Sequence, residues 1–92
     1  MAETIDWLHA FIGQTVVLDL AEQHLAIGTL AEVSRDHLAL TDADLHDRRE
    51  ANSTKDVYLI ETRHIGVRVN RKRVVVPRHL VLAVSRLEDV ST

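Results

Sequence analysis

The basic run at residues 68–79, RVNRKRVVVPRH, is the strongest chemical feature of the chain. Arginine and lysine in such a run can contact nucleic-acid phosphates without sequence selectivity, and histidine can add a hydrogen-bond donor. The candidate nucleic-acid-binding residues are His37, Arg71, Lys72, Arg73, Arg78 and His79. The alternative is that the basic residues pair with acidic turns around Glu32, Asp36 and 42–47, within the chain or across a subunit interface.

Charge is distributed unevenly along the sequence. The net charge is −3, but residues 1–61 carry −8, residues 62–86 carry +7 and residues 87–92 carry −2. Such asymmetry marks either a polyanion-binding face or two halves that neutralise each other. The net charge alone therefore does not describe the surface that a partner would meet.

Acidic and histidine residues near the middle of the chain suggest a second kind of site. Asp42, Asp44 and His46 share one face of a straight strand, and such side chains can hold a divalent ion. The run lacks the glycine and distal glutamate of a calcium loop, so a solvated strand end is favoured. His24 and His37 could join His46 across adjacent strands, but only as a weak metal site. No catalytic triad, phosphate-binding glycine loop or nucleotide fingerprint is present, so we expect no enzyme, metal or cofactor.

Length and composition restrict the class of protein. The 92 residues are enough for one small domain, 1–92, and 46% of them are hydrophobic, which excludes a disordered chain. No apolar run approaches the ~18 residues of a membrane span, and no signal peptide is visible. The absence of cysteine excludes disulfides, thiolate zinc sites and thiol nucleophiles. We expect a cytoplasmic protein without a membrane partner.

The first half of the chain predicts a short helix and three strands. Residues 4–12 form the helix, with Thr4 as N-cap and Gly13 as its end, and we expect Trp7 and Phe11 to pack beneath the strands. Alternating apolar residues predict strands at 15–21, 25–34 and 37–45, with tight turns at 21–24 and 34–36. Gly28 indicates a bend or bulge, and a change of apolar parity indicates another bulge near Thr41.

The second half predicts an inserted helix and two further strands. After a loop at 46–53, residues 53–56 have capping-box form and 55–65 fit a helix that ends at Gly66. Its apolar stripe is Val57, Ile60, His64 and Ile65. The strand-like run Val57–Ile60 keeps a strand at 55–65 as the alternative.

A turn at 70–72 precedes strands at 73–76 and 80–86, with Pro77 at a strand end, and the tail from Leu87 is expected to fray. Five short antiparallel strands with a bent central strand predict a small, strongly curved barrel in a mainly β (α+β) protein.

This order resembles the Sm-like (LSm) fold, an N-terminal helix followed by five bent antiparallel strands. The resemblance is carried by Gly13 and by the strand TVVLDL (15–20). The run GTLAEVSRDHLALTD (28–42) resembles the first Sm motif, and the second Sm motif would fall on VVVPRHLVLAV (74–84). The segment 47–70 departs from the family, because it is longer than the usual connection between the third and fourth strands.

The resemblance implies a homo-oligomer. Sm-like proteins form rings in which the fourth strand of one subunit pairs with the fifth strand of the next, here 73–77 with 80–86. Pro77 removes one donor and the inserted helix could cap the ring site, so a dimer is the alternative assembly.

The resemblance also implies single-stranded RNA as the ligand, held by the turn after strand two and the turn between strands four and five. His37 stands where the family has an asparagine, and the family's stacking aromatic is absent there. Arg78-His79 resembles the Lys-His pair of a bacterial RNA chaperone of this family. We therefore expect a non-catalytic, oligomeric, Sm-like binding module for single-stranded RNA. The alternative is a protein-interaction scaffold that binds no nucleic acid.

Overall fold

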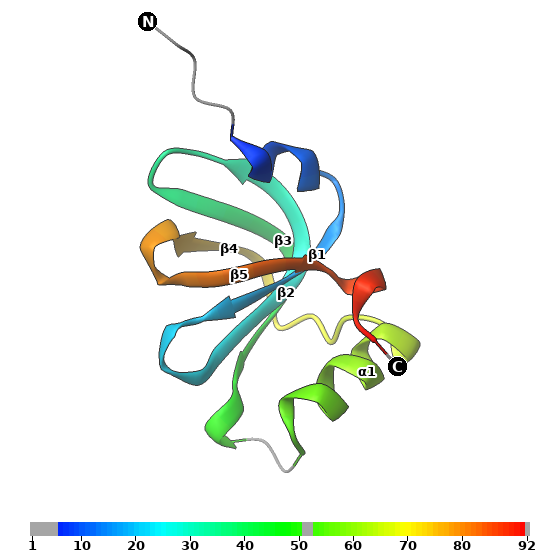
Figure 1. The fold of residues 1–92 in the computed structure, drawn as a ribbon. Helices are drawn as coiled ribbons and strands as arrows, with labels where there is room; N and C mark the ends of the chain where they lie inside the picture. Colours follow the sequence, from blue (N-terminus) through cyan, green and yellow to red (C-terminus); the bar gives the residue numbers. More distant parts are fainter. Residues whose placement is uncertain (1–5, 51–52, 92) are drawn as a thin grey trace, which may run out of the picture.

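The chain forms a curved antiparallel sheet with a helix on its outer face (Figure 1). The structure, a computed structural model, describes residues 6–50 and 53–91. The strands are β1 (Thr15–Leu20), β2 (His24–Val33), β3 (His37–Asp47), β4 (Arg71–Pro77) and β5 (Val81–Arg86). The α-helix is α1 (Lys55–Ile65), and the 3₁₀ helices are η1 (Trp7–Phe11), η2 (Ala21–Gln23), η3 (Arg48–Glu50), η4 (Arg78–Leu80) and η5 (Leu87–Asp89). None of these helices is both long and apolar enough to cross a membrane.

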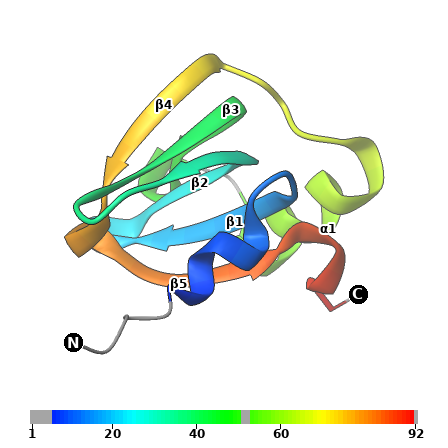
Figure 2. The same ribbon diagram turned by 90° about the horizontal axis from the view of Figure 1, so that it is seen from above.

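The connection between the last two strands requires the sheet to curl. The strand order is β4-β3-β2-β1-β5, so β4 and β5 form its two edges. Only the three residues of η4 separate these edge strands in sequence. Because three residues span about 10 Å at most, the edges must approach each other at that end. Figure 2 shows the resulting curl. The expected order of strands and inserted helix, and the mainly β architecture, are confirmed.

The bulges that the sequence predicts at Gly28 and near Thr41 are one irregularity, which bends both central strands. Between the pairs Ile27–Asp44 and Thr29–Thr41, Gly28 lies opposite two residues of β3, one of which, Asp42, has a φ of 48°. A second register shift, between Leu30 and Glu32, is not predicted by the sequence. A Cβ at Gly28 would lie 2.9 Å from the Ala43 Cβ and 3.0 Å from the Thr41 carbonyl oxygen. The strands can therefore approach closely only because residue 28 has no side chain.

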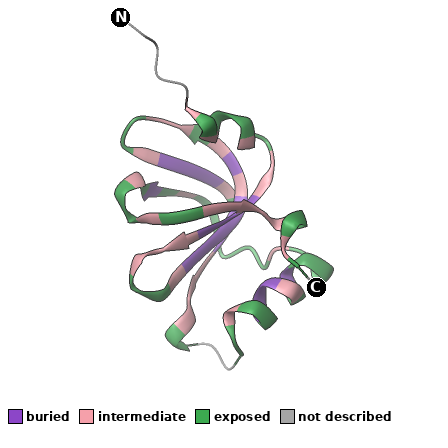
Figure 3. Cartoon of the chain, viewed as in Figure 1, coloured by how far each residue is buried: buried purple, intermediate pink, exposed green. Residues whose placement is uncertain are grey.

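Two apolar layers lie on opposite faces of the sheet. Figure 3 shows the buried residues in purple, along the strands and on part of α1. The buried residues of the concave layer are Val16, Leu18, Ala26, Leu30, Leu38, Leu40, Ala43 and Val76. Those of the convex layer are Val17, Leu25, Ile27, Tyr58 and Leu59. β1 and β2 are therefore covered on both faces, whereas the alternation in β1 predicts only a half-buried strand.

The inserted helix is confirmed, but its packing face differs from the prediction. α1 begins after Thr54, whose hydroxyl accepts from the Val57 amide, so the N-cap is Thr54 and not Ser53, the serine of the predicted capping box. The helix ends at Gly66 with φ 105°. The strand alternative for 55–65 is therefore wrong. Tyr58, Leu59 and Thr62 face the sheet. The predicted stripe is wrong because Val57 and Ile65 are exposed.

The N-terminal helix is shorter than predicted, and its indole does not pack beneath the strands. The Asp6 carboxylate caps η1 by accepting from the Leu8 amide at 3.1 Å. The predicted cap, Thr4, lies outside the described residues. Phe11 packs against the concave layer as expected, whereas the Trp7 side chain is 77% exposed. The packing prediction is therefore correct for Phe11 and wrong for Trp7.

Three boundaries in the second half need correction. β3 extends to Asp47 and η3 follows it, where a loop at 46–53 is predicted; residues 51–52 lie outside the described residues. β4 begins at Arg71, so the predicted turn at 70–72 is wrong. Residues 87–90 do not fray as predicted, because Leu87 and Val90 pack against the convex layer. In all three cases, pairing or packing with distant segments orders residues that the local sequence assigns to a loop, a turn or a loose tail.

Candidate nucleic-acid interface

Two turns from distant parts of the sequence meet at one end of the sheet. The Ser34 amide donates to the His37 carbonyl oxygen at 2.9 Å, which closes the turn between β2 and β3. The Arg78 amide donates to the Asp36 carbonyl oxygen at 2.8 Å, and His37 pairs with Pro77 in the sheet register. The structure therefore brings the backbone of His37 next to that of Arg78, and His79 follows Arg78 in the same short turn.

Arg78 holds this arrangement together. Its guanidinium donates to both carboxylate oxygens of Asp6 at 2.8 and 2.9 Å, and to the Ser34 carbonyl oxygen at 2.9 Å. These hydrogen bonds lower the pKa of Asp6 below its usual value. Such charge-assisted bidentate pairs fix geometry as well as charge. Arg78 therefore positions η1 against the two turns, and most of its donors are already in use.

The three basic residues of β4 do not form one surface with Arg78. Successive residues of a strand point to opposite faces, and Val76 belongs to the concave layer. Lys72 is therefore on the Val76 side of the strand, and Arg71 and Arg73 are on the other side. The Arg73 guanidinium pairs with the Glu32 carboxylate at 3.0 Å. Part of the basic run is thus neutralised within the chain, as the alternative interpretation expects.

A groove beside the two turns contains residues that the sequence analysis did not select. It has a volume of about 620 Å³. Its lining includes Trp7, His9 and Arg35, and the Asp6–Arg78 pair. Trp7, His9 and Arg35 are all exposed. Residue type and spacing do not distinguish Trp7 from Phe11, since both are aromatic residues of the same predicted helix and only Phe11 packs against the concave layer.

The acidic and histidine residues of β3 form a structural cluster. Asp44 is 2% exposed, accepts from the Tyr58 hydroxyl, and accepts from the Asn70 side-chain amide at 3.1 Å. His46 stacks on Tyr58 with ring centroids 4.0 Å apart, and the Arg68 guanidinium lies 4.8 Å from the centre of the Tyr58 ring. Burial and the hydrogen bond to Asp44 raise the Tyr58 pKa. Through Tyr58, these contacts with Asp44 and His46 hold α1 against β3.

The three-histidine metal hypothesis is wrong. His46 pairs with Leu25, and the adjacent residue His24 pairs with Asp47, so the two histidines occupy opposite faces of the sheet. His37 lies at the far end of β3. Within residues 6–50 and 53–91, no cluster of three or more histidines and carboxylates can hold a metal ion.

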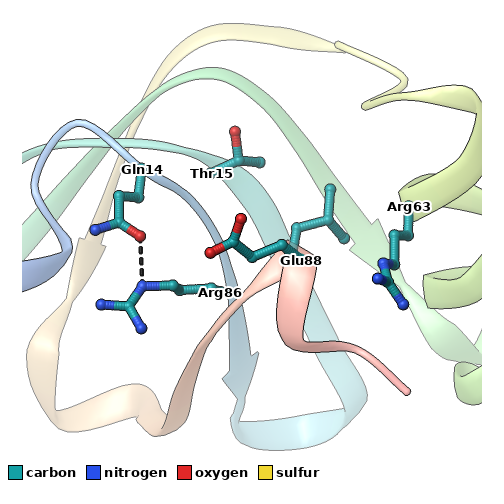
Figure 4. A pocket seen from close by; sticks show the side chains of 6 residues that line it. Gln14, Thr15, Arg63, Arg86 and Glu88 are labelled. Carbon is teal, nitrogen blue, oxygen red and sulfur yellow. Dashed lines mark hydrogen bonds between the residues drawn. The ribbon is translucent and has the colours of Figure 1, made fainter. Parts of the chain in front are cut away.

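A second pocket lies where α1 approaches the end of β5 (Figure 4). Arg63 and Arg86 line it together with Thr15, and its volume is about 440 Å³. The Arg86 Nε donates to the Gln14 side-chain oxygen. The Glu88 carboxylate points into the space between the two guanidinium groups (Figure 4). This mixed charge makes the pocket a poorer match for a polyanion than the groove beside Trp7.

Comparisons with known proteins identify the fold. An Sm protein of Pyrococcus abyssii, in complex with a uridine heptamer, matches with a TM-score of 0.62 and 19% identity over 92% of this chain and 99% of that chain. A chain of the NatC complex bound to CoA matches with a TM-score of 0.58 and 22% identity over 97% of this chain and 100% of that chain. A chain of the NatC complex bound to Gag peptide and CoA matches with a TM-score of 0.55 and 24% identity over 84% of this chain and 86% of that chain.

No protein-family model and no curated protein matches the sequence. The identity of the fold therefore depends on structure alone. Two observations support it. The five antiparallel strands form a curled sheet in which β4 approaches β5, and the match covers nearly the whole of the Sm protein. The chain has the Sm-like fold, with α1 inserted between its third and fourth strands.

Proposed function

We propose that the protein is a non-catalytic, oligomeric Sm-like module that binds single-stranded RNA. The observation that carries this proposal is the meeting of the 34–37 and 78–80 turns, joined by the hydrogen bond from Arg78 to Asp36. These are the two turns that the Sm resemblance implies as the RNA-binding site. The similar Sm protein in complex with a uridine heptamer supports the same ligand class.

The chemistry of the two turns fits an RNA strand. His37 and His79 are donors to phosphate or base edges at the meeting point of the turns. Lys72 and Arg71 are exposed at the start of β4, away from the turns and on opposite faces of the strand, so they add long-range attraction for phosphates rather than contacts at the turns. Arg78 positions the turns, so its substitution would disturb the fold as well as binding.

Fluorescence anisotropy with a labelled uridine heptamer tests the proposal. The affinity should fall steeply as salt rises from 50 to 300 mM, because phosphate contacts release counterions. Replacing His37 and His79 together by alanine should weaken binding about tenfold, since each lost hydrogen bond costs about 0.5–1.5 kcal/mol. His64→Ala, an exposed histidine on α1, is the matched control and should bind normally. Absence of binding at 50 mM salt would exclude RNA as the ligand.

The two edge strands support self-assembly. Within the described chain, β4 and β5 each pair with one neighbouring strand. Each carries an exposed apolar residue, Val75 on β4 and Leu82 on β5. Antiparallel pairing of β4 with β5 of a second copy would satisfy the free backbone groups and cover both side chains. It would also bring the basic start of β4 near Glu88 and Asp89 of that copy.

A second candidate function is a protein-interaction subunit that binds no nucleic acid. The observation that favours it is the similarity to a chain of the NatC complex, which this chain covers completely. The exposed apolar residues Val57, Ile65 and Val69 lie in and after the inserted helix, where a partner could dock. An assembled protein that fails to bind RNA at low salt would favour this function.

A further inference from the structure

We propose that the pocket between α1 and the end of β5 binds a small organic dianion, in its simplest form a dicarboxylate, with one acidic group on Arg63 and the other on Arg86. Both arginines line this pocket, and they come from elements far apart in the sequence. The lining includes neither the 34–37 turn nor the 78–80 turn, so the proposal goes beyond the proposed RNA binding and does not depend on it.

Arg63 is anchored on one side of the pocket and retains unused donors. Its Nη1 donates to the Val90 carbonyl oxygen at 2.7 Å, and Val90 packs against the convex layer. Among residues 6–50 and 53–91, no carboxylate forms an ion pair with Arg63. Its charge and its other two nitrogens are therefore available to a ligand.

Arg86 is oriented by its neighbours. Its Nε donates to the Gln14 side-chain oxygen, and the Gln14 side-chain nitrogen donates to the Ala10 carbonyl oxygen at 3.2 Å. The guanidinium carbon lies 5.2 Å from the centre of the Phe11 ring. The Asp89 carboxylate is 3.8 Å from Nη1, which is beyond hydrogen-bonding distance. Both terminal nitrogens of Arg86 are thus left without a hydrogen bond in the part of the chain that the structure describes.

The shape of the pocket favours a ligand with two acidic groups. The two guanidinium groups lie on opposite sides of it (Figure 4). Its volume of about 440 Å³ lies in the range of sites for small organic molecules. Leu87 and Thr15 also line the pocket, so a short carbon chain would meet apolar atoms between the arginines. Each end of a dicarboxylate would then accept charge-assisted hydrogen bonds from one guanidinium.

Glu88 is the internal competitor for this site. Its carboxylate points into the space between the two guanidinium groups (Figure 4). Within the described ranges it forms no ion pair with either arginine, and the side chain is exposed on the three-residue η5. An acidic group can therefore occupy this space, and the Glu88 side chain can rotate into solvent. A dianion would replace it because two linked contacts bind more tightly than one.

Isothermal titration calorimetry of the full chain at constant ionic strength tests the two-point contact. Among malonate, succinate and glutarate, the best-fitting length should bind about tenfold more tightly than acetate, because a second charged contact is gained. Arg63→Gln should reduce this affinity to that of acetate. Arg71→Gln removes the same charge outside the pocket and should leave the affinity unchanged.

Glu88→Gln provides a test that a purely structural role cannot imitate. It should raise the dicarboxylate affinity about two- to fivefold, because it removes one opposing exposed charge. Its matched control is Glu61→Gln, which makes the same charge change on α1, where Glu61 pairs with Arg68 outside the pocket. This gain decides the question if Arg63→Gln also loosens the contact with Val90 and lowers the melting temperature.

Three results would overturn the proposal. Acetate or inorganic phosphate binding as tightly as the best dicarboxylate would exclude a two-point contact. An unchanged affinity in Glu88→Gln would place the anion elsewhere on the surface. Displacement of the dicarboxylate by a uridine heptamer would assign these arginines to an RNA site instead. Failure of the heptamer to bind at 50 mM salt would contradict only the proposed function, since the dicarboxylate titration does not involve RNA.

Discussion

At the scale of single residues, the Tyr58–Asp44 hydrogen bond is the clearest determinant of stability. Asp44 is buried on β3, and the Tyr58 hydroxyl from α1 is one of its two side-chain donors. Tyr58→Phe should lower the free energy of unfolding by about 1–3 kcal/mol, because it leaves a buried acceptor partly unsatisfied. Urea denaturation measures this loss, and an unchanged midpoint would show that water replaces the hydroxyl.

The same pair predicts how stability changes in alkali. Burial, and then the hydrogen bond to Asp44, raise the pKa of Tyr58 above its ordinary value of 10.0. The folded state therefore favours the protonated phenol. This contribution is fully present below pH 10 and is lost as the pH rises through the folded-state pKa. Tyr58→Phe should remove this part of the alkaline dependence, which denaturation at several pH values would reveal.

The close approach of β2 and β3 at Gly28 leaves no room for a side chain. Gly28→Ala should destabilise the protein by about 1–3 kcal/mol, because the new methyl group would meet the Cβ and backbone of Ala43. Thermal unfolding measures the effect. The double variant Gly28→Ala with Ala43→Gly should recover part of the loss, since it removes one of the clashing methyl groups. If Gly28→Ala alone is neutral, the strands do not approach as closely as described.

At the scale of elements, α1 packs against the sheet through one side of the helix, which carries its buried residues Tyr58, Leu59 and Thr62. Leu59 is 6% exposed and packs in the convex layer, whereas Ile65, on the same helix, is 74% exposed. Leu59→Ala should cost about 2–5 kcal/mol, the range for a buried leucine. Ile65→Ala is the matched control and should change stability by less than about 0.5 kcal/mol. Equal effects in chemical denaturation would mean that the helix packs through another face.

At the scale of the whole molecule, the free edges of the sheet predict assembly. Leu82 on β5 is 72% exposed, and pairing with β4 of a second copy would bury it. Leu82→Arg should therefore shift the solution mass to smaller species, measured by light scattering at micromolar concentration. Ile65→Arg alters a side chain of similar exposure away from both edges and should leave the mass unchanged. A wild-type monomer would contradict the prediction outright.

The sequence by itself determined the features that depend on neighbouring residues. Apolar alternation located the strands, and the parity change in β3 located its bulge, because a strand alternates its faces at every residue. Gly28 marked a bend or bulge, and the polar residues before Lys55 together with Gly66 bounded α1. His37, Arg78 and His79 were selected by residue type and resemblance, and the structure places them together.

Only the tertiary structure decided the features that depend on distant partners. α1 has apolar side chains on more than one side, and docking of Tyr58 on Asp44, 14 residues earlier, selected the buried side. Arg78 meets Asp6, 72 residues away, so local sequence could not show that its charge is already paired. Trp7 looked like a core residue by type. Whether it is buried depends on how η1 sits on the sheet, and burial is a property of the assembled surfaces, which local spacing does not encode.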